Sequence, residues 1–331
     1  MNRKTCRGIK DLMFWQSLVS GKLSNMIEVV KADPELVLHF RNNYLNVYYH
    51  SGNIAKITSE RGLIIDENYF ISCDEENYIR NPKKQTPEDK MRHEKLIERR
   101  DKFKKLFYEG KYVEYFSEMK ETMQKYWKYY PSKNNEDEGD VQQELCVKNQ
   151  FESTESEFTI IDLEHEVSVN ADFCYKGTTP FPKKAKDGTF LKKEKPRFDI
   201  VAVRKKTGQL YVMELKKGTG ALYGTSGMHD HVDSFEHTIR ENKEAESSFI
   251  EEIEYILMQK QIMGLIDKRV KISHDEVQFA FVYSFSDNHR STRKLEKAEV
   301  EYLSKQEIKG IKIADYPIIY LRPDEYTLKC S

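Results

Sequence analysis

Two short apolar segments separated by a turn constrain the fold of this chain more than any other feature of its sequence. Residues 198–203 and 210–216 are rich in β-forming side chains, and the sequence Lys-Lys-Thr-Gly at 205–208 lies between them. Two such segments joined by a short stretch that contains glycine are typical of a β-hairpin. We therefore expect two adjacent antiparallel strands here.

The segments on either side of this hairpin predict a mixed α/β domain. A helix is expected from about residue 228, because four apolar side chains recur on one face at helical spacing, namely Met228, Val232, Phe235 and Ile239. The other expected elements are a helix over 141–151, a strand over 158–169, a helix over 247–266, and strands over 277–285 and 318–321.

The N-terminal part of the chain has a different pattern. Three β-rich segments with short polar turns predict a β-meander over 36–57, and residues 88–130 form a charged, helical stretch that a proline ends. Residues 132–140 are polar and acidic without a single aliphatic side chain, which is typical of a linker. We expect an N-terminal α+β domain at 1–131, a β-meander plus charged helices that positions substrate or a partner, and a second domain at 141–331.

The composition indicates a folded protein that does not span a membrane. The 54 basic and 55 acidic side chains leave a net charge of −1, and 17 Phe and 20 Tyr are far more aromatics than a disordered chain carries. No stretch approaches the roughly 20 apolar residues of a membrane helix, and no signal-peptide pattern opens the sequence. The five cysteines are scattered without a CxxC pair. We expect a cytoplasmic protein with reduced thiols.

The predicted hairpin carries charges that an ordinary buried strand lacks. Side chains alternate between the two faces of a strand, so Glu214 and Lys216 share one face. Pairing within the hairpin can bring Asp199 beside Glu214. Two neighbouring carboxylates repel unless a proton or a cation lies between them, and Mg²⁺ favours one or two carboxylates together with water and phosphate oxygens. The residues alone therefore suggest metal-assisted hydrolysis of phosphodiester bonds.

Asp199, fifteen positions before Glu214-Leu215-Lys216 on adjacent strands, resembles the motif of the PD-(D/E)XK superfamily of restriction-endonuclease-like nucleases. The resemblance implies a restriction-endonuclease-like αβββαβ sandwich. It also implies that Asp199 and Glu214 bind Mg²⁺ or Mn²⁺, that the backbone carbonyl of Leu215 is a further metal ligand, and that Lys216 orients the nucleophilic water.

The resemblance covers residues 141–285, and no family resemblance was found for the N-terminal domain. Pro196 stands three residues before the aspartate rather than next to it, a departure that many members share. Many members add an acidic residue from the helix that precedes the first strand, and Glu144 stands at the matching position as a further catalytic residue and metal ligand.

Glu164 is the alternative fourth carboxylate. Strand alternation places Asp162, Glu164 and Glu166 on one face of the expected strand, from which Glu164 could reach the site. We place Glu144 ahead of it.

The helix after the hairpin contains two further candidates. His229 and Asp233 lie in its polar stripe, and we expect them to support the site or to contact phosphate. His229-Asp230-His231 invites interpretation as a zinc site, but residues two apart on a helix diverge and could not share one ion. We expect the histidines without an evident partner, among them His165, to be structural.

A basic loop leads into the strand that bears Asp199. It contains seven basic residues between 183 and 197, and we predict that the four nearest the strand bind a nucleic-acid backbone: Lys192, Lys193, Lys195 and Arg197. The alternative is a solvated face, which is the usual meaning of a charged run, and the sequence pI of about 6.8 lacks the basic signature of a general nucleic-acid binder.

These features predict a metal-dependent nuclease that acts on DNA rather than RNA, in restriction, phage defence or DNA repair, as a homodimer or within a larger complex. Two alternatives stay open. The domain could be a catalytically silent module that keeps the fold and binds nucleic acid or protein. Asp199, Glu214 and Lys216 could instead form a structural ion-pair network.

Overall fold

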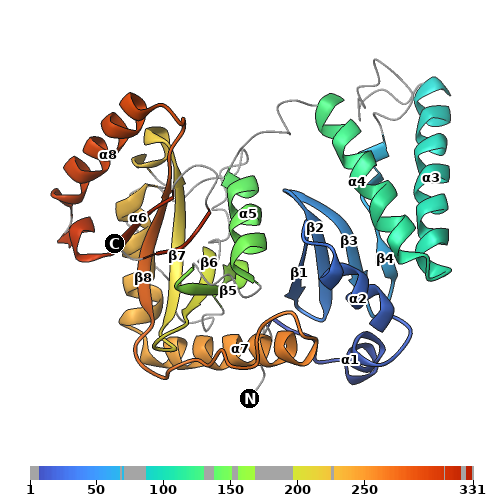
Figure 1. The fold of residues 1–331 in the computed structure, drawn as a ribbon, viewed down its shortest axis with the longest axis horizontal. Coiled ribbons are helices and arrows are strands. Elements are labelled where there is room, and N and C mark those ends of the chain that lie inside the picture. The colour runs from blue at the N-terminus through green and yellow to red at the C-terminus, as the bar shows by residue number, and fades with distance from the viewer. Residues whose placement is uncertain are drawn as a thin grey trace, which may run out of the picture. The chain divides into compact units, whose positions relative to one another are not determined.

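The chain divides into two compact units, Arg7–Gln143 and Glu144–Ser331, drawn as a ribbon in Figure 1. The division falls within helix α5 (Glu138–Gln150). Of the expected linker, residues 138–140 form the start of this helix, and residues 132–137 lie outside the described part of the chain. The computed structural model describes residues 7–67, 69–70, 87–129, 138–150, 156–167, 197–224, 227–308, 310–321 and 326–329.

The N-terminal unit contains the expected meander, extended by one strand. Its sheet has the order β1-β2-β3-β4, and each strand is antiparallel to the next. Asn43 and His50 adopt left-handed φ values of 54° and 47° at the tight turns, a conformation in which Asn and His are enriched among non-glycine residues. The strands are β1 (Leu36–Arg41), β2 (Tyr44–Tyr49), β3 (Gly52–Thr58) and β4 (Gly62–Ile64).

Helices precede and follow this sheet. The charged stretch expected to be helical forms two helices, because the chain turns at Gly110, whose φ of 77° is readily adopted only by glycine. Tyr115 is fully buried and its hydroxyl donates to the carbonyl of Ile54 at 2.6 Å, which fixes α4 on β3. The helices are α1 (Leu12–Val19), α2 (Ser24–Ala32), α3 (Pro87–Tyr108) and α4 (Tyr112–Tyr129).

The C-terminal unit is built on a five-stranded mixed sheet of order β11-β8-β7-β6-β5. The first three strands in chain order pair antiparallel, whereas β8 runs parallel to β7 and β11 runs parallel to β8. The expected mixed α/β class is therefore confirmed. The strands are β5 (Phe158–Glu166), β6 (Arg197–Arg204), β7 (Leu210–Lys217), β8 (Gln278–Ser284) and β11 (Ile318–Leu321).

The expected hairpin is formed by β6 and β7. Gly208 takes a φ of 76° in the turn, and its amide donates to the carbonyl of Arg204 at 2.9 Å. A Cβ at this position would lie 3.0 Å from the carbonyl oxygen of Lys271, so both the backbone conformation and the space call for glycine.

Helices pack against the sheet through the faces that their sequences predict. Helix α6 buries its apolar stripe, and the ring of Phe235 lies 5.1 Å from Phe279 on β8 and 6.3 Å from Phe198 on β6. Helix α8 and the hairpin β9–β10 were not expected from their charged sequence. The remaining elements are α6 (Met228–Phe235), the π-helix η5 (Glu236–Arg240), α7 (Lys243–Ile262), α8 (Arg290–Ser304), β9 (Glu307–Ile308) and β10 (Ile311–Lys312).

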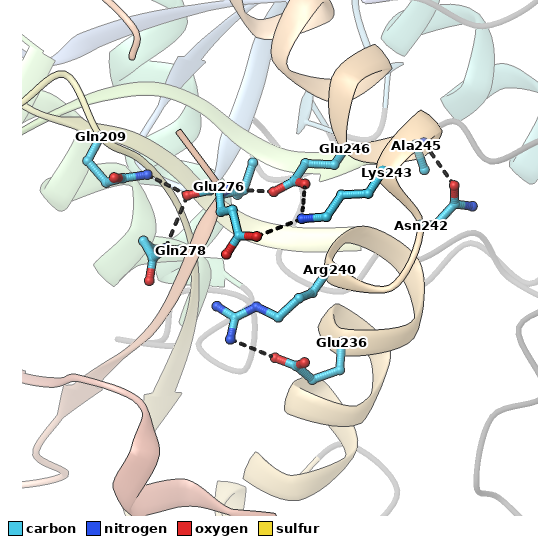
Figure 2. A network of polar contacts seen from close by, with 10 residues as sticks. Gln209, Glu236, Arg240, Asn242, Lys243, Ala245, Glu246, Glu276 and Gln278 are labelled. Carbon is cyan, nitrogen blue, oxygen red and sulfur yellow. Dashed lines mark hydrogen bonds and ion pairs between the residues drawn. The ribbon is translucent and has the colours of Figure 1, made fainter. Parts of the chain in front are cut away.

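A polar network ties the start of α7 to the start of β8 (Figure 2). The buried carboxylate of Glu246 accepts the amide of Val277 at 2.7 Å and an ammonium hydrogen bond from Lys243 at 3.0 Å. Lys243 also reaches the exposed carboxylate of Glu276 at 2.8 Å. The network fixes the start of α7 to the segment that leads into β8.

Among the helices that the structure describes, none combines the length and apolar character needed to cross a membrane.

Candidate acidic site at the β6–β7 fork

The backbone pairing of β6 with β7 ends at Ile200 and Met213, and a side chain takes over beyond that point. The amide of Leu215 donates to Asp199 Oδ2 at 2.9 Å, so a carboxylate accepts the hydrogen bond that a strand carbonyl would otherwise receive. The two strands fork here. The fork holds the Asp199 carboxylate beside the next residue of β7, Glu214.

Glu214 and Lys216 lie on one face of β7, as strand alternation predicts. Glu214 is 1 % exposed and the Lys216 side chain 5 %, and Lys216 Nζ lies 3.9 Å from Glu214 Oε2. Their partners across the parallel pairing with β8 are Phe281 and Tyr283. An acidic group and an ammonium are thus held in a largely apolar, aromatic environment, where electrostatic interactions are stronger than in water.

The two carboxyls are close enough to perturb each other. Burial, the negative charge of Glu214 and a hydrogen bond to Glu214 raise the pKa of Asp199 well above its usual range. The positive charge of Lys216 and the hydrogen bond from the Leu215 amide act in the opposite direction but are smaller. The pair therefore favours a shared proton, or a cation in its place.

Helix α6 adds a residue that the sequence analysis did not select. His231 Nδ1 lies 3.1 Å from Glu214 Oε2, and the side chain is 24 % exposed. The two residues predicted on this helix make other contacts. His229 Nε2 is 3.4 Å from the carbonyl of Gln306, and Asp233 Oδ1 is 3.4 Å from His237 Nε2.

A signal for His231 was present in the sequence. It stands three residues after Met228 and four before Phe235, two residues that α6 buries against the sheet, so these three share a helix face. His229 and Asp233 stand one residue after Met228 and two before Phe235, on other faces. The apolar stripe that placed α6 on the sheet therefore also points His231 toward β7.

The structure places Glu144 on α5, half-buried, and Glu164 on β5 between Leu163 and His165, whose partners on β6, Ile200 and Phe198, flank Asp199. In the part of the chain that the structure describes, no three His, Cys, Asp or Glu side chains are grouped so that they could hold a metal ion. Neither glutamate completes such a group with Asp199 and Glu214. The acidic pair is the part of the site that is formed, and Glu144 stays a prediction.

The expectation that Asp162, Glu164 and Glu166 share one face is wrong. A left-handed φ of 53° at Glu164 breaks the alternation of β5 between Asp162 and Glu166. Asp162 is fully buried and lies 2.8 Å from His165 Nδ1, whereas Glu166 is exposed. His165 Nε2 in turn lies 3.9 Å from Glu252 on α7.

Of the four predicted nucleic-acid-binding residues, only Arg197 is described. It is exposed at the start of β6 and pairs with Glu164, Nη1 to Oε2, at 2.8 Å. Lys192, Lys193 and Lys195 lie outside the described residues. Arg197 lies two residues from Asp199, so a phosphate bound by its guanidinium would be near the acidic pair.

Comparison of the chain with protein-family models, with curated proteins and with solved structures gave no match. The fold and the site define a mixed α/β protein in which a half-buried aspartate and a buried glutamate lie together at a strand fork.

Proposed function

We propose that the C-terminal unit is a metal-dependent nuclease of the PD-(D/E)XK type. The observation that carries the proposal is the meeting of Asp199 and Glu214 at the β6–β7 fork, with Lys216 on the same face. The order α5-β5-β6-β7-α6-α7-β8, with three antiparallel strands followed by a parallel one, agrees with the αβββαβ sandwich implied by the sequence resemblance.

The donor set fits a small hard cation. Two adjacent carboxylates with a strong tendency to share a positive charge are the ligands that Mg²⁺ or Mn²⁺ takes from a protein, with water and phosphate oxygens completing its shell. Asp199 and Glu214 would hold the cation, with the Leu215 carbonyl as the third protein oxygen. Such a cation activates water and stabilises charge on the phosphoryl group.

The chain's own groups have separate tasks in this proposal. The Leu215 amide fixes the Asp199 carboxylate before any ligand binds. Lys216, too far from Glu214 for a direct hydrogen bond, donates to the attacking water or to a phosphate oxygen. The burial of Glu214 and Lys216 excludes bulk water and strengthens the electrostatic interactions that they make.

Nucleic acid is the proposed substrate and partner, DNA rather than RNA. Arg197 supports a nucleic-acid partner, because its guanidinium lies two residues from Asp199 and can bind phosphate. The preference for DNA rests on the sequence resemblance. We further propose a cytoplasmic role in restriction, phage defence or repair, with two copies of the chain cutting the two strands of a duplex.

The experiment is cleavage of supercoiled plasmid, circular single-stranded DNA and RNA by the purified full chain in Mg²⁺, Mn²⁺ or EDTA. Glu214→Gln is the test variant, and Glu276→Gln, which changes an exposed carboxylate at the start of β8, is its matched control. Metal-dependent cutting by wild type and Glu276→Gln but not by Glu214→Gln is expected. Cutting by Glu214→Gln at the wild-type rate, or by no protein on any substrate, would contradict the proposal.

A further inference from the structure

The orientation of the Glu214 carboxylate is not fixed by its own rotamer. The last torsion of a glutamate side chain is broad and has no sharp staggered wells. The direction in which its oxygens point must therefore be set by groups around it. At the β6–β7 fork this direction matters, because the carboxylate has to meet Asp199 and any cation that replaces their shared proton.

Among the residues that the structure describes, two side-chain nitrogens lie near the same oxygen of Glu214. His231 Nδ1 lies 3.1 Å from Oε2, whereas Lys216 Nζ lies 3.9 Å from it, beyond hydrogen-bond distance. An imidazole that carries a hydrogen on Nδ1 can donate to this oxygen. Of the two donors, His231 is therefore the one that can hold Oε2 in place.

The imidazole is itself held by packing. Met228, Val232 and Phe235 of α6 are fully buried, and Phe235 contacts rings on two strands of the sheet. His231 lies among these anchors on the same helix face. Its distance from β7 is thus set by the apolar contacts of α6.

Asp199 and Glu214 have similar surroundings on one side of their carboxylates. The Leu215 amide donates to Asp199 Oδ2 at 2.9 Å, and His231 Nδ1 lies 3.1 Å from Glu214 Oε2. Each carboxylate thus has a nitrogen of the protein in contact with one of its oxygens. The charge of Glu214 raises the pKa of Asp199, so the two carboxyls are close enough to favour a shared proton or a cation in its place.

We propose that His231 is a positioning residue that orients Glu214 for cation binding through the contact of its Nδ1 with Glu214 Oε2. The inference deepens the proposed function and rests on it, since the cation is the one assigned to Asp199 and Glu214. Groups that orient a metal ligand typically contribute 10–100-fold to metal affinity. His231 acts through Glu214 and needs no contact with the substrate.

The test is Mn²⁺ affinity of the full chain, measured by electron paramagnetic resonance of the free ion, for four variants. In His231→Asn the side-chain amide nitrogen stands close to the position of Nδ1. In His231→Gln the amide nitrogen stands away from that position, and His231→Ala has no side-chain nitrogen. His274→Asn is the matched control, because His274 also lies 3.1 Å from a glutamate, Glu254, but is exposed and has no place in the proposed site. Melting temperatures are measured in parallel to confirm folding.

We expect about a tenfold or larger loss of Mn²⁺ affinity in His231→Gln and His231→Ala, and near wild-type affinity in His231→Asn and His274→Asn. Equal affinity in wild type and all His231 variants overturns the inference about His231 and leaves the proposed metal site in place. Equal losses in the Asn and Gln variants overturn it too, because general packing would then explain the effect. A wild-type protein that binds no Mn²⁺ overturns the inference together with the proposed metal site.

Discussion

The amide of Leu215 donates a 2.9 Å hydrogen bond to the carboxylate of Asp199, across the point where β6 and β7 stop pairing through their backbones. The Asp199 side chain thus continues the link between β6 and β7 beyond their backbone pairing, and it also places a carboxylate beside Glu214. The acidic pair is built into the fold rather than displayed on a loop. Binding of a cation would need no rearrangement of the strands, and this underlies the predictions that follow.

Asp199→Asn should remove a pH-dependent loss of stability from the metal-free protein. Folding raises the pKa of Asp199 through burial and the charge of Glu214. The folded state therefore binds more protons than the unfolded chain above about pH 4, the usual pKa range of an aspartate. Stability is fully present below that value and falls as the pH rises through the raised pKa.

The measurement is the melting temperature in EDTA between pH 4 and pH 9. Wild type should lose stability relative to Asp199→Asn as the pH rises, and the amide oxygen of the variant can still accept the Leu215 hydrogen bond. Parallel curves of melting temperature against pH for the two proteins would contradict the prediction, because ionisation of Asp199 would then not change the stability.

Lys216→Met should separate a catalytic lysine from a structural one. If Lys216 orients water or phosphate, its loss should lower kcat by about 10²–10³-fold, as removal of one key donor in an active site does, and should leave Mn²⁺ binding intact. If the cluster is a structural ion-pair network, the variant leaves buried carboxylates with less compensation and loses about 3–5 kcal/mol. Single-turnover cleavage and chemical denaturation, run on one preparation, distinguish these results.

Glu246→Ala should destabilise the C-terminal unit by about 1–3 kcal/mol. The change removes the acceptor of the buried Val277 amide, and a buried donor left without an acceptor costs this much. Glu276→Ala is the control, because it removes an exposed partner of the same lysine and should change little. Urea unfolding followed by circular dichroism reports both, and an equal effect of the two changes would argue against the role given to Glu246.

Arg197→Ala should weaken DNA binding in a salt-dependent way. Loss of one phosphate contact should lower the slope of log K against log salt by about 0.9, with little effect on stability because its pair with Glu164 is exposed. Fluorescence anisotropy in a Glu214→Gln background keeps the duplex intact. Arg269→Ala, which removes another exposed arginine paired with a carboxylate, is the control. An unchanged slope in Arg197→Ala would remove this residue from the nucleic-acid surface.

Local patterns predicted those parts of the C-terminal unit that depend on local physics. The turn residue Gly208, the alternation that pairs Glu214 with Lys216, and the apolar stripe of α6 each act over a few positions, and the structure contains all three. The order of helices and strands followed from the same signals. Helix α8 was missed because its charged sequence buries only a narrow stripe.

Features that arise from irregular backbone or from contacts between distant elements were not predictable in the same way. The contact of Asp162 with His165 depends on the left-handed conformation of Glu164, which no alternation rule contains. The contact of His231 with Glu214 joins residues 17 apart on different elements. Its helix face was visible in the sequence, but the strand that this face meets was not.

The most direct test is the effect of Mg²⁺ on the melting temperature, because it requires no knowledge of the substrate. Wild type and Glu276→Gln should be stabilised by mass action, by about 2.7 kcal/mol when the ion is at a hundredfold its Kd, whereas Glu214→Gln should show no Mg²⁺ shift. Absence of a shift in wild type, or an equal shift in Glu214→Gln, would contradict a cation site at Asp199 and Glu214.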